Sequence, residues 1–304
     1  MKFLTTRQLA RMWQVSEATI KRWADAGHLL SSRTLGGHRR FALDEVARFQ
    51  TSRGLSGSTP ARREDHRAAQ GTAQQSAPGG DDAKEHFFKA IVQGREGEAA
   101  ALLLESYLSG ASLVGILDET VAGAMQRIGR LWHGGELSLI DEHLATRTTM
   151  RALEVLSRSV RNEPSNRREA FCCATEEEYH EVALLCVQIL LESEGWQVKN
   201  FGANTPFFAL TEIVARECPQ LVCISSTTHA ALERTAREYA QLHEAARACR
   251  ARIVLGGEGF RHETIRQRFP ADLHAENFRD LLAFVRTADA PNDDAHDAAG
   301  AHAI

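Results

Sequence analysis

The C-terminal part of the chain, residues 168–289, alternates between short apolar runs and longer amphipathic stretches. A short apolar run between turn residues predicts a buried strand, and apolar residues spaced three or four apart predict a helix. The predicted strands are 170–175, 197–201, 221–225, 252–255 and, more weakly, 272–274, and the predicted helices are 179–194, 206–218, 230–248 and 262–268. Strands that alternate with helices indicate a Rossmann-like α/β domain with a parallel sheet.

The residues before it, 84–163, have helical spacing only. The predicted helices lie around Phe87–Val92 and at 99–108, 113–131 and 137–160, with short glycine-containing connectors between them. Short connectors place consecutive helices antiparallel. We therefore expect a four-helix bundle in front of the α/β domain.

The N-terminal residues, 1–53, combine short helices with a glycine-tipped hairpin. The predicted elements are, in order, a helix from Thr5 or Thr6 to Trp13, a helix from Ser16 to Gly27, a hairpin over 29–41 and a short helix over 44–49. Capping residues mark the helix starts and a glycine marks the end of the second helix. This order predicts a winged helix-turn-helix, which makes the whole chain a multidomain protein.

Two segments lack the residues of a core. Residues 54–83 are rich in Gly, Ser, Ala, Gln and Pro, and residues 290–304 are small and acidic. Such compositions predict a flexible linker and a disordered tail. A flexible linker implies that signals reach the N-terminal domain through assembly or proximity and not through a rigid lever.

The composition is that of an ordinary globular protein, with 43% hydrophobic and 25% charged residues. There is no apolar run of membrane-spanning length and no apolar stretch near Met1 of signal-peptide length, so we expect a cytoplasmic protein without a membrane partner. The six cysteines form no paired framework and are predicted to be reduced, mostly in the core.

The net charge of −4 conceals a basic N-terminal domain. Residues 1–53 contain ten Lys or Arg against four Asp or Glu, which favours a polyanion partner. The segment contains the motif T-x-R-Q-L-A…S-x-x-T-I-K-R-W…G-G-H-R-R-F. This motif resembles the MerR/excisionase family of DNA-binding domains, and the resemblance implies promoter DNA as the partner. The residues predicted to contact DNA are Thr19, Lys21, Arg22, Arg33, His38, Arg39 and Arg40.

A histidine follows the first strand of the α/β domain. Glu178, two positions before His180, can accept a proton from one ring nitrogen and leave the other free for a metal such as cobalt. The carboxyl end of a strand is also where open α/β sheets bind ligands. A Ser/Thr run at 225–227 and two glycines at 256–257 follow after the next apolar strands.

This order and spacing resemble the cobalamin-binding signature of base-off/His-on corrinoid proteins. The resemblance makes His180 the lower cobalt ligand and implies that the following residues contact the cofactor: Glu178, His180, Ala183, Thr205, Ser225, Thr227, Gly256 and Gly257. Ala183 stands where the family has glycine. Its methyl group narrows the slot for the nucleotide tail of the cofactor.

The bundle contains Trp132 followed, after nine positions, by Glu142 and His143. Taken alone, the pattern favours a core tryptophan and a helix start. Beside a cobalamin-type domain it resembles the motif of CarH/LitR photoreceptor regulators, in which these residues enclose the adenosyl group of adenosylcobalamin. The same resemblance implies that Leu139 contacts the cofactor and that His133 becomes the upper cobalt ligand after light.

The three segments together resemble a light-responsive, adenosylcobalamin-binding regulator, which implies a repressor and not an enzyme. The resemblance implies a homo-oligomer, a tetramer, that binds operator DNA in the dark and falls apart when light cleaves the Co–C bond. Two alternatives stay open. The same scaffold could sense another tetrapyrrole, oxygen or a protein partner, or the chain could be a corrinoid methyl carrier.

Overall fold

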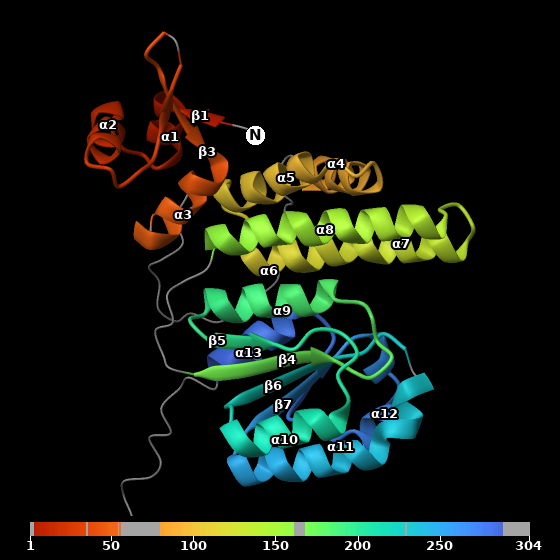
Figure 1. The fold of residues 1–304 in the computed structure, drawn as a ribbon. Helices are drawn as coiled ribbons and strands as arrows, with labels where there is room; N and C mark the ends of the chain where they lie inside the picture. Colours follow the sequence, from red (N-terminus) through yellow and green to blue (C-terminus); the bar gives the residue numbers. More distant parts are fainter. Residues whose placement is uncertain are drawn as a thin grey trace, which may run out of the picture.

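A computed structural model describes residues 3–34, 36–53, 55, 80–160, 168–228 and 230–287, without the side chains of 230–234. It stacks a small N-terminal domain, a helical bundle and an α/β domain (Figure 1). Most of the predicted linker, 54–83, and the whole predicted tail, 290–304, lie outside the described residues.

The N-terminal domain is a winged helix-turn-helix, as its sequence predicts. Its elements are β1 (Phe3–Thr5), α1 (Thr6–Met12), α2 (Glu17–Asp25), β2 (Ser32–Arg33), β3 (Arg39–Ala42) and α3 (Leu43–Arg53). Thr5 and Gln8 form a reciprocal cap at the start of α1, and the Ser16 hydroxyl caps α2. The strands form an antiparallel sheet in the order β1-β3-β2. The sequence did not predict β1, and α3 is longer than the helix predicted over 44–49.

The bundle consists of α4 (Gly80–Val92), α5 (Glu96–Leu108), a third helix in three parts and α8 (Leu139–Val160). The parts of the third helix are α6 (Leu113–Gly115), a π-helical segment η1 (Ile116–Ala122) and α7 (Gly123–His133). Helical periodicity predicts all four helices, but it does not distinguish the π-helical turn from ordinary α-helix. The first helix begins at Gly80, inside the segment predicted as linker.

The α/β domain has a fully parallel five-stranded sheet in the order β5-β4-β6-β7-β8. Its elements are β4 (Glu169–Ala174), α9 (Val182–Ser193), β5 (Gln197–Asn200), α10 (Phe207–Glu217), β6 (Leu221–Ser225), α11 (Ala230–Cys249), β7 (Arg252–Gly256), η2 (Glu258–Phe260), α12 (Glu263–Arg268), β8 (Leu273–Ala275) and α13 (Phe278–Thr287). Helices α9 and α13 cover one face, and α10 and α11 cover the other (Figure 1). The chain order reverses between β4 and β6, so their carboxyl ends form the switch point where such sheets bind ligands.

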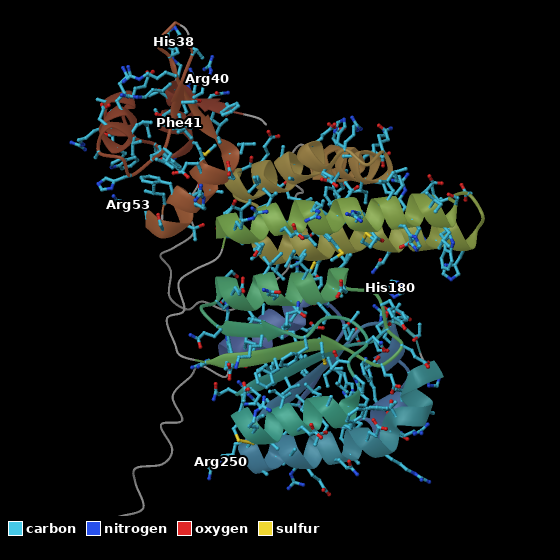
Figure 2. All side chains as sticks on the ribbon, in the orientation of Figure 1. His38, Arg40, Phe41, Arg53, His180 and Arg250 are labelled. Carbon is cyan, nitrogen blue, oxygen red and sulfur yellow. A yellow bond between two sulfur atoms is a disulfide. The ribbon has the colours of Figure 1, made fainter. Side chains whose placement is uncertain are left out.

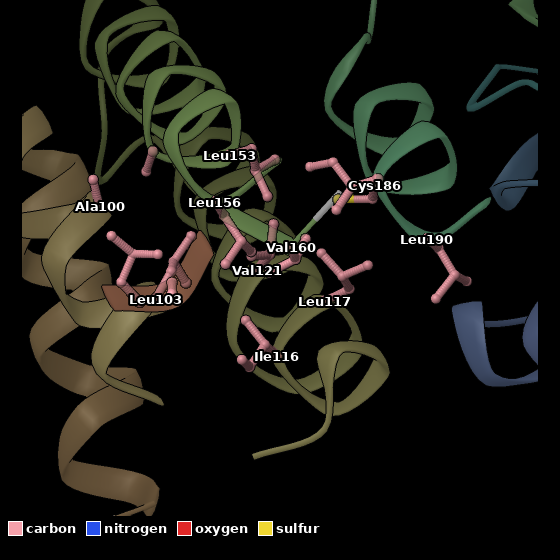
Figure 3. Packing of buried hydrophobic residues seen from close by; sticks show 14 of the residues in the cluster. Ala100, Leu103, Ile116, Leu117, Val121, Leu153, Leu156, Val160, Cys186 and Leu190 are labelled. Carbon is pink, nitrogen blue, oxygen red and sulfur yellow. The ribbon is translucent and has the colours of Figure 1, made fainter. Parts of the chain in front are cut away.

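One continuous apolar core runs from the N-terminal domain through the bundle to the α9 side of the sheet. Figure 3 shows Cys186 of α9 on the side that faces the bundle, where Leu117 and Leu153 belong to the same cluster. The Asp118 carboxylate also accepts bonds from the backbone N–H groups of Phe278 and Arg279 at the start of α13, at 2.8 and 3.2 Å. The bundle and the α/β domain are therefore held together by packing and by a helix cap.

Two sequence-based expectations are wrong. The N-terminal domain is not merely tethered, because α3 packs against α5 and α8 of the bundle within the same core. Not all six cysteines are reduced either, because Cys218 and Cys249 form a disulfide between the ends of α10 and α11. The other four cysteines are free and buried. Both contacts join residues far apart in the chain, which local sequence patterns do not reveal.

Candidate functional site

The loop after β4 holds the Glu178–His180 pair predicted as the lower ligand set. Only 1% of Glu178 is exposed. Its Oε1 accepts bonds from the Nδ1 and the backbone N–H of His180, at 2.5 and 2.9 Å, and its Oε2 accepts one from the backbone N–H of Thr227 at 2.5 Å. Glu178 therefore joins the loops after β4 and β6 and fixes the imidazole ring. The Nε2 of His180, on a side chain that is 62% exposed, is left for a ligand.

The electrostatics of the pair follow from these bonds. Burial works to raise the pKa of Glu178, but the hydrogen bonds from His180 and Thr227 outweigh it and lower that pKa to about 2. The bond to Glu178 raises the pKa of His180 against partial burial, and the charge of Glu142 on the bundle adds to the effect. Glu142 therefore lies within electrostatic reach of His180. A carboxylate behind the imidazole increases the basicity of its free nitrogen as a metal ligand.

The ends of β6 and β7 approach each other so closely that glycine is required. Gly257 has φ +96°, and a Cβ there would lie 2.3 Å from the carbonyl oxygen of Ser226. Ser226 is fully buried, accepts a bond from the Thr175 hydroxyl at 3.0 Å and donates one to the carbonyl of Thr228. Ser225 is 8% exposed and Thr227 is exposed. Sequence reasoning missed Ser226, because the motif marks only the residues on either side of it.

The loop from Gly202 to Pro206 completes this edge of the sheet. Thr205 pairs with Thr175 in a parallel bridge, and its backbone N–H donates to the carbonyl of Ala174 at 3.0 Å. The backbone N–H of Ala203 donates to the Glu181 carboxylate at 3.1 Å. Ala183 lies partly exposed in the first turn of α9, and Gly256 ends β7. The structure thus brings all eight residues predicted for the lower side to one edge of the domain.

The predicted upper residues lie at the α7–α8 turn of the bundle. Gly135, at φ +75°, reverses the chain after α7, and reciprocal bonds between Ser138 and Asp141 begin α8. The Trp132 ring is 41% exposed and contacts the His133 ring edge-on, with 4.6 Å between centroids. The His133 Nδ1 lies 2.8 Å from the carbonyl of Gly129, which leaves its Nε2 free.

Glu142 and His143 occupy the first turn of α8. The Glu142 side chain is 16% exposed, accepts a bond from the Thr146 hydroxyl at 2.8 Å, and lies 3.6 Å from the Nε2 of His143. Several large apolar side chains around this turn are exposed, namely Trp132, Leu139, Ile140 and Leu144, together with Tyr179 beside His180. Exposed apolar side chains in one region mark a binding surface. Sequence reasoning missed Ile140, Leu144 and Tyr179 because exposure is not visible in a helical pattern.

The donor set suits a metal that brings its other ligands with it. Within the described residues, no group of three or more His, Cys, Asp or Glu side chains could hold a metal ion. His180 offers one nitrogen, and His133 has a free nitrogen at the facing turn. A cobalt ion already held in a corrin ring needs only such axial ligands, and the apolar side chains at the α7–α8 turn match its organic surface. The residues therefore fit a cobalamin.

The side chains predicted to contact DNA differ in their exposure to solvent. Lys21, Arg22, Arg33 and His38 are exposed, and Thr19 and Arg40 are half-buried. Only 12% of the Arg39 side chain is exposed, and it pairs with Asp25, so it ties the hairpin to α2. His38 and Arg40 lie on the hairpin that projects away from the bundle (Figure 2). Their contact with DNA remains a prediction.

Comparison with known proteins agrees with this division of the chain. A helix-turn-helix domain family matches residues 3–54, and two B12 binding domain families match residues 83–157 and 171–278. The HTH-type transcriptional repressor CarA of Myxococcus xanthus is 27% identical over 291 residues, which cover 92% of this chain and 95% of that protein. This similarity and the order of the domains support a CarA/CarH-type B12-dependent transcriptional regulator.

Two further matches are corrinoid proteins that cover about two thirds of this chain. Trimethylamine corrinoid protein 1 of Methanosarcina acetivorans is 22% identical over 200 residues, which cover 65% of this chain and 92% of that protein. The solved structure of the Methanosarcina barkeri monomethylamine corrinoid protein superposes with a TM-score of 0.57 at 18% identity, over 68% of this chain and 99% of that chain. That likeness shows a common fold for the bundle and the α/β domain.

The match to the first B12 binding domain ends at residue 157, three residues before α8 ends. The bundle is therefore part of the cofactor-binding unit and not a separate spacer. None of the helices in the described part of the chain is both long enough and apolar enough to cross a bilayer.

Proposed function

We propose that this chain is a light-responsive repressor that binds adenosylcobalamin between its bundle and its α/β domain. The observation that carries the proposal is the orientation of His180. Buried Glu178 fixes its ring, and Glu142 of the bundle faces it closely enough to raise its pKa. The similarity to a repressor over 92% of the chain supports the regulatory assignment.

Each side chain has a defined task in this proposal. When bound, adenosylcobalamin supplies a cobalt–carbon bond that light can break. His180 would hold the cobalt of a bound cobalamin through Nε2, while Glu178 keeps the ring in one tautomer. Trp132, Glu142 and His143 cover the upper side, and Leu139 adds apolar contact. His133, whose Nε2 is free, would supply a second histidine ligand to cobalt after light.

The regulatory output is DNA binding by an assembly. In the dark, filled chains associate as a tetramer and place several basic N-terminal domains on one operator. Linked binding domains gain affinity because the second contact is intramolecular, by about 100-fold or more. Light disrupts the assembly and releases the DNA. A regulator of promoters works where the DNA is, so we place the protein in the cytoplasm and assign it no enzymatic role.

Gel filtration and electrophoretic mobility shift on operator DNA, in the dark and after green light, test the proposal. We expect wild type to bind adenosylcobalamin, to elute as a tetramer in the dark and to lose both assembly and DNA binding after illumination. His180→Ala should bind the cofactor far more weakly and stay unassembled. Wild-type protein that does not bind adenosylcobalamin, or stays equally assembled after light, contradicts the proposal.

A methyl-carrier function is the second candidate, because the chain is similar to a trimethylamine corrinoid protein. The lower ligand set suits either function. The basic N-terminal domain and the His133 position are explained only by the regulator. Methyl transfer from methylcobalamin-loaded protein to an acceptor, in the presence of partner enzymes, would favour the carrier. Absorption spectra after loading with haem or biliverdin test a different tetrapyrrole.

A further inference from the structure

The N-terminal domain is docked on the bundle through one face of α3. Leu43, Ala47 and Thr51 are spaced four residues apart, which places them on the same side of the helix. Leu43 and Ala47 are 4% and 0% exposed. The Thr51 hydroxyl donates to the carbonyl of Ser159 in α8 at 3.1 Å and lies 3.3 Å from the hydroxyl of Tyr107 in α5. These hydrogen bonds join residues 56 and 108 positions apart.

The joint is only partly filled. An open groove of about 580 Å³ lies beside α3, between it and α5 and α8. Ala100, Leu104 and Val155 of the bundle make part of its lining apolar. The charged lining residues are Asp44 and Arg48 of α3 and Arg158 of α8. A contact with unfilled space beside it can change its angle without compressing a packed core. The angle of this joint can therefore change when α8 moves, while the N-terminal domain stays attached to the bundle.

Helix α8 connects this joint to the candidate cofactor site. It is continuous over 22 residues, a length of about 33 Å. Glu142 and His143 lie in its first turn, and Ser159 lies next to its last residue. Between these ends α8 packs on α9 of the α/β domain (Figure 1). A displacement of the first turn therefore moves the last turn, because an uninterrupted helix does not bend easily.

We infer that α8 is a lever that carries the state of the cofactor site to the DNA-binding domain within a single chain. The inference rests on the proposed function for its stimulus. The docked domain keeps α2 and its hairpin on the side away from the bundle (Figure 1). Docking therefore orients the surfaces predicted to bind DNA and does not cover them. A fixed orientation lowers the entropy lost when several domains bind one operator together.

The test compares two substitutions that add the same charge to α3. Ala47→Glu places a carboxylate in the buried joint, whereas Ser52→Glu places it at an exposed position on the same helix. Spin labels on Ala18→Cys and Gln126→Cys, both exposed positions, report the distance between the N-terminal domain and the bundle. The native free thiols are buried, so they do not compete for the label.

In protein without cofactor, we expect a narrow distance distribution for wild type and Ser52→Glu and a broad one for Ala47→Glu. Near-ultraviolet circular dichroism checks that the N-terminal domain remains folded. If Ala47→Glu unfolds that domain, Thr51→Val replaces it as the joint variant in the distance measurement. This substitution removes the bonds to Ser159 and Tyr107 without changing side-chain size. A broad distribution in wild type, or an unchanged one in a folded joint variant, overturns the docking.

Adding adenosylcobalamin in the dark, and then green light, tests the lever itself. We expect the label distance of wild type to shift with each step and the shift to vanish in the joint variant, which still binds the cofactor by its absorption spectrum. DNA affinity of the joint variant in the dark should fall by about tenfold. Cofactor binding without any shift in wild type overturns the lever and leaves the proposed function intact. Failure to bind the cofactor contradicts the proposed function, while the cofactor-free distances still decide the docking.

Discussion

The two sides of the candidate site are built in different ways. On the lower side, Glu178 is buried and makes three hydrogen bonds, and Gly257 fits against Ser226 with no room for a methyl group. On the upper side, Trp132, Leu139 and Ile140 are 41%, 51% and 72% exposed. The lower side is held by hydrogen bonds and close packing, whereas the upper side presents exposed apolar side chains.

This difference suits a switch. A site that must keep its ligand through a change of state needs one fixed anchor, and a site that must report the change needs one side that can rearrange. The hydrogen bonds of Glu178 provide the fixed anchor. The upper turn is held mainly by local bonds, those of Ser138 with Asp141 and of Glu142 with Thr146. Substitutions of the same kind on both sides should therefore have unequal effects.

The largest difference between the two sides is expected in the cobalamin affinity of two glutamate variants. Glu178→Gln removes the charge that orients His180, and loss of such a partner typically lowers metal affinity by about 10–100-fold. Glu142→Gln removes a charge from the more adaptable side and should lower cobalamin affinity only by about threefold or less. Titration followed by absorption measures both affinities. Equal losses for the two variants would show that the lower side is not the anchor.

The next difference concerns two glycines with positive φ. Gly257→Ala puts a Cβ 2.3 Å from the Ser226 carbonyl, so the backbone must shift. Gly135→Ala meets no atom within 4 Å and suffers only the strain of its φ of +75°. We expect a cost of about 3 kcal/mol or more for Gly257→Ala and about 1 kcal/mol for Gly135→Ala. Thermal unfolding measures the loss of stability in both variants, and a smaller loss for Gly257→Ala than for Gly135→Ala would contradict the expected order.

Much of the fold and of the lower side follows from the sequence, because the relevant signals are local. Strand-length segments between turn residues predict the five strands of the sheet, and helical spacing predicts the bundle. The motif around His180 works in the same way. Its residues lie at or after the ends of predicted strands, and the carboxyl ends of parallel strands meet at one edge of the sheet.

The parts that the sequence did not reveal depend on contacts between distant residues. Helix α13 begins where Asp118, 160 residues earlier, accepts the N–H of Phe278. The sequence of α3 does not show which of its faces packs against α8. Ser226 accepts a hydrogen bond from the hydroxyl of Thr175, which is 51 residues away in the chain. The upper residues were predicted from a family resemblance, since their spacing alone indicates only a helix start.

The hydrogen bonds that join the bundle to the α/β domain at Asp118 offer a third test. Burial raises the pKa of Asp118, although the N–H groups of Phe278 and Arg279 lower it. Asp118→Ala removes a cap and should cost about 1 kcal/mol. Neighbouring Glu119 bonds Lys84 at the exposed surface, so Glu119→Ala should change stability by less than about 0.5 kcal/mol. Denaturant midpoints compare them, and equal midpoints would argue against a structural role for the cap.

The smallest effect on stability is expected at the most exposed apolar residue of the upper side. Ile140 is 72% exposed, so Ile140→Ser should change the free energy of unfolding by less than about 0.5 kcal/mol. If the corrin covers this surface, the same variant should weaken cobalamin binding measurably, because apolar area buried on binding is lost. Exposed Phe208 on α10 provides the control, since Phe208→Ser removes apolar surface from the other face of the sheet. Weaker cobalamin binding by the Ile140 variant alone would locate the adaptable side at the α7–α8 turn, whereas unchanged binding in both would show that Ile140 stays in solvent.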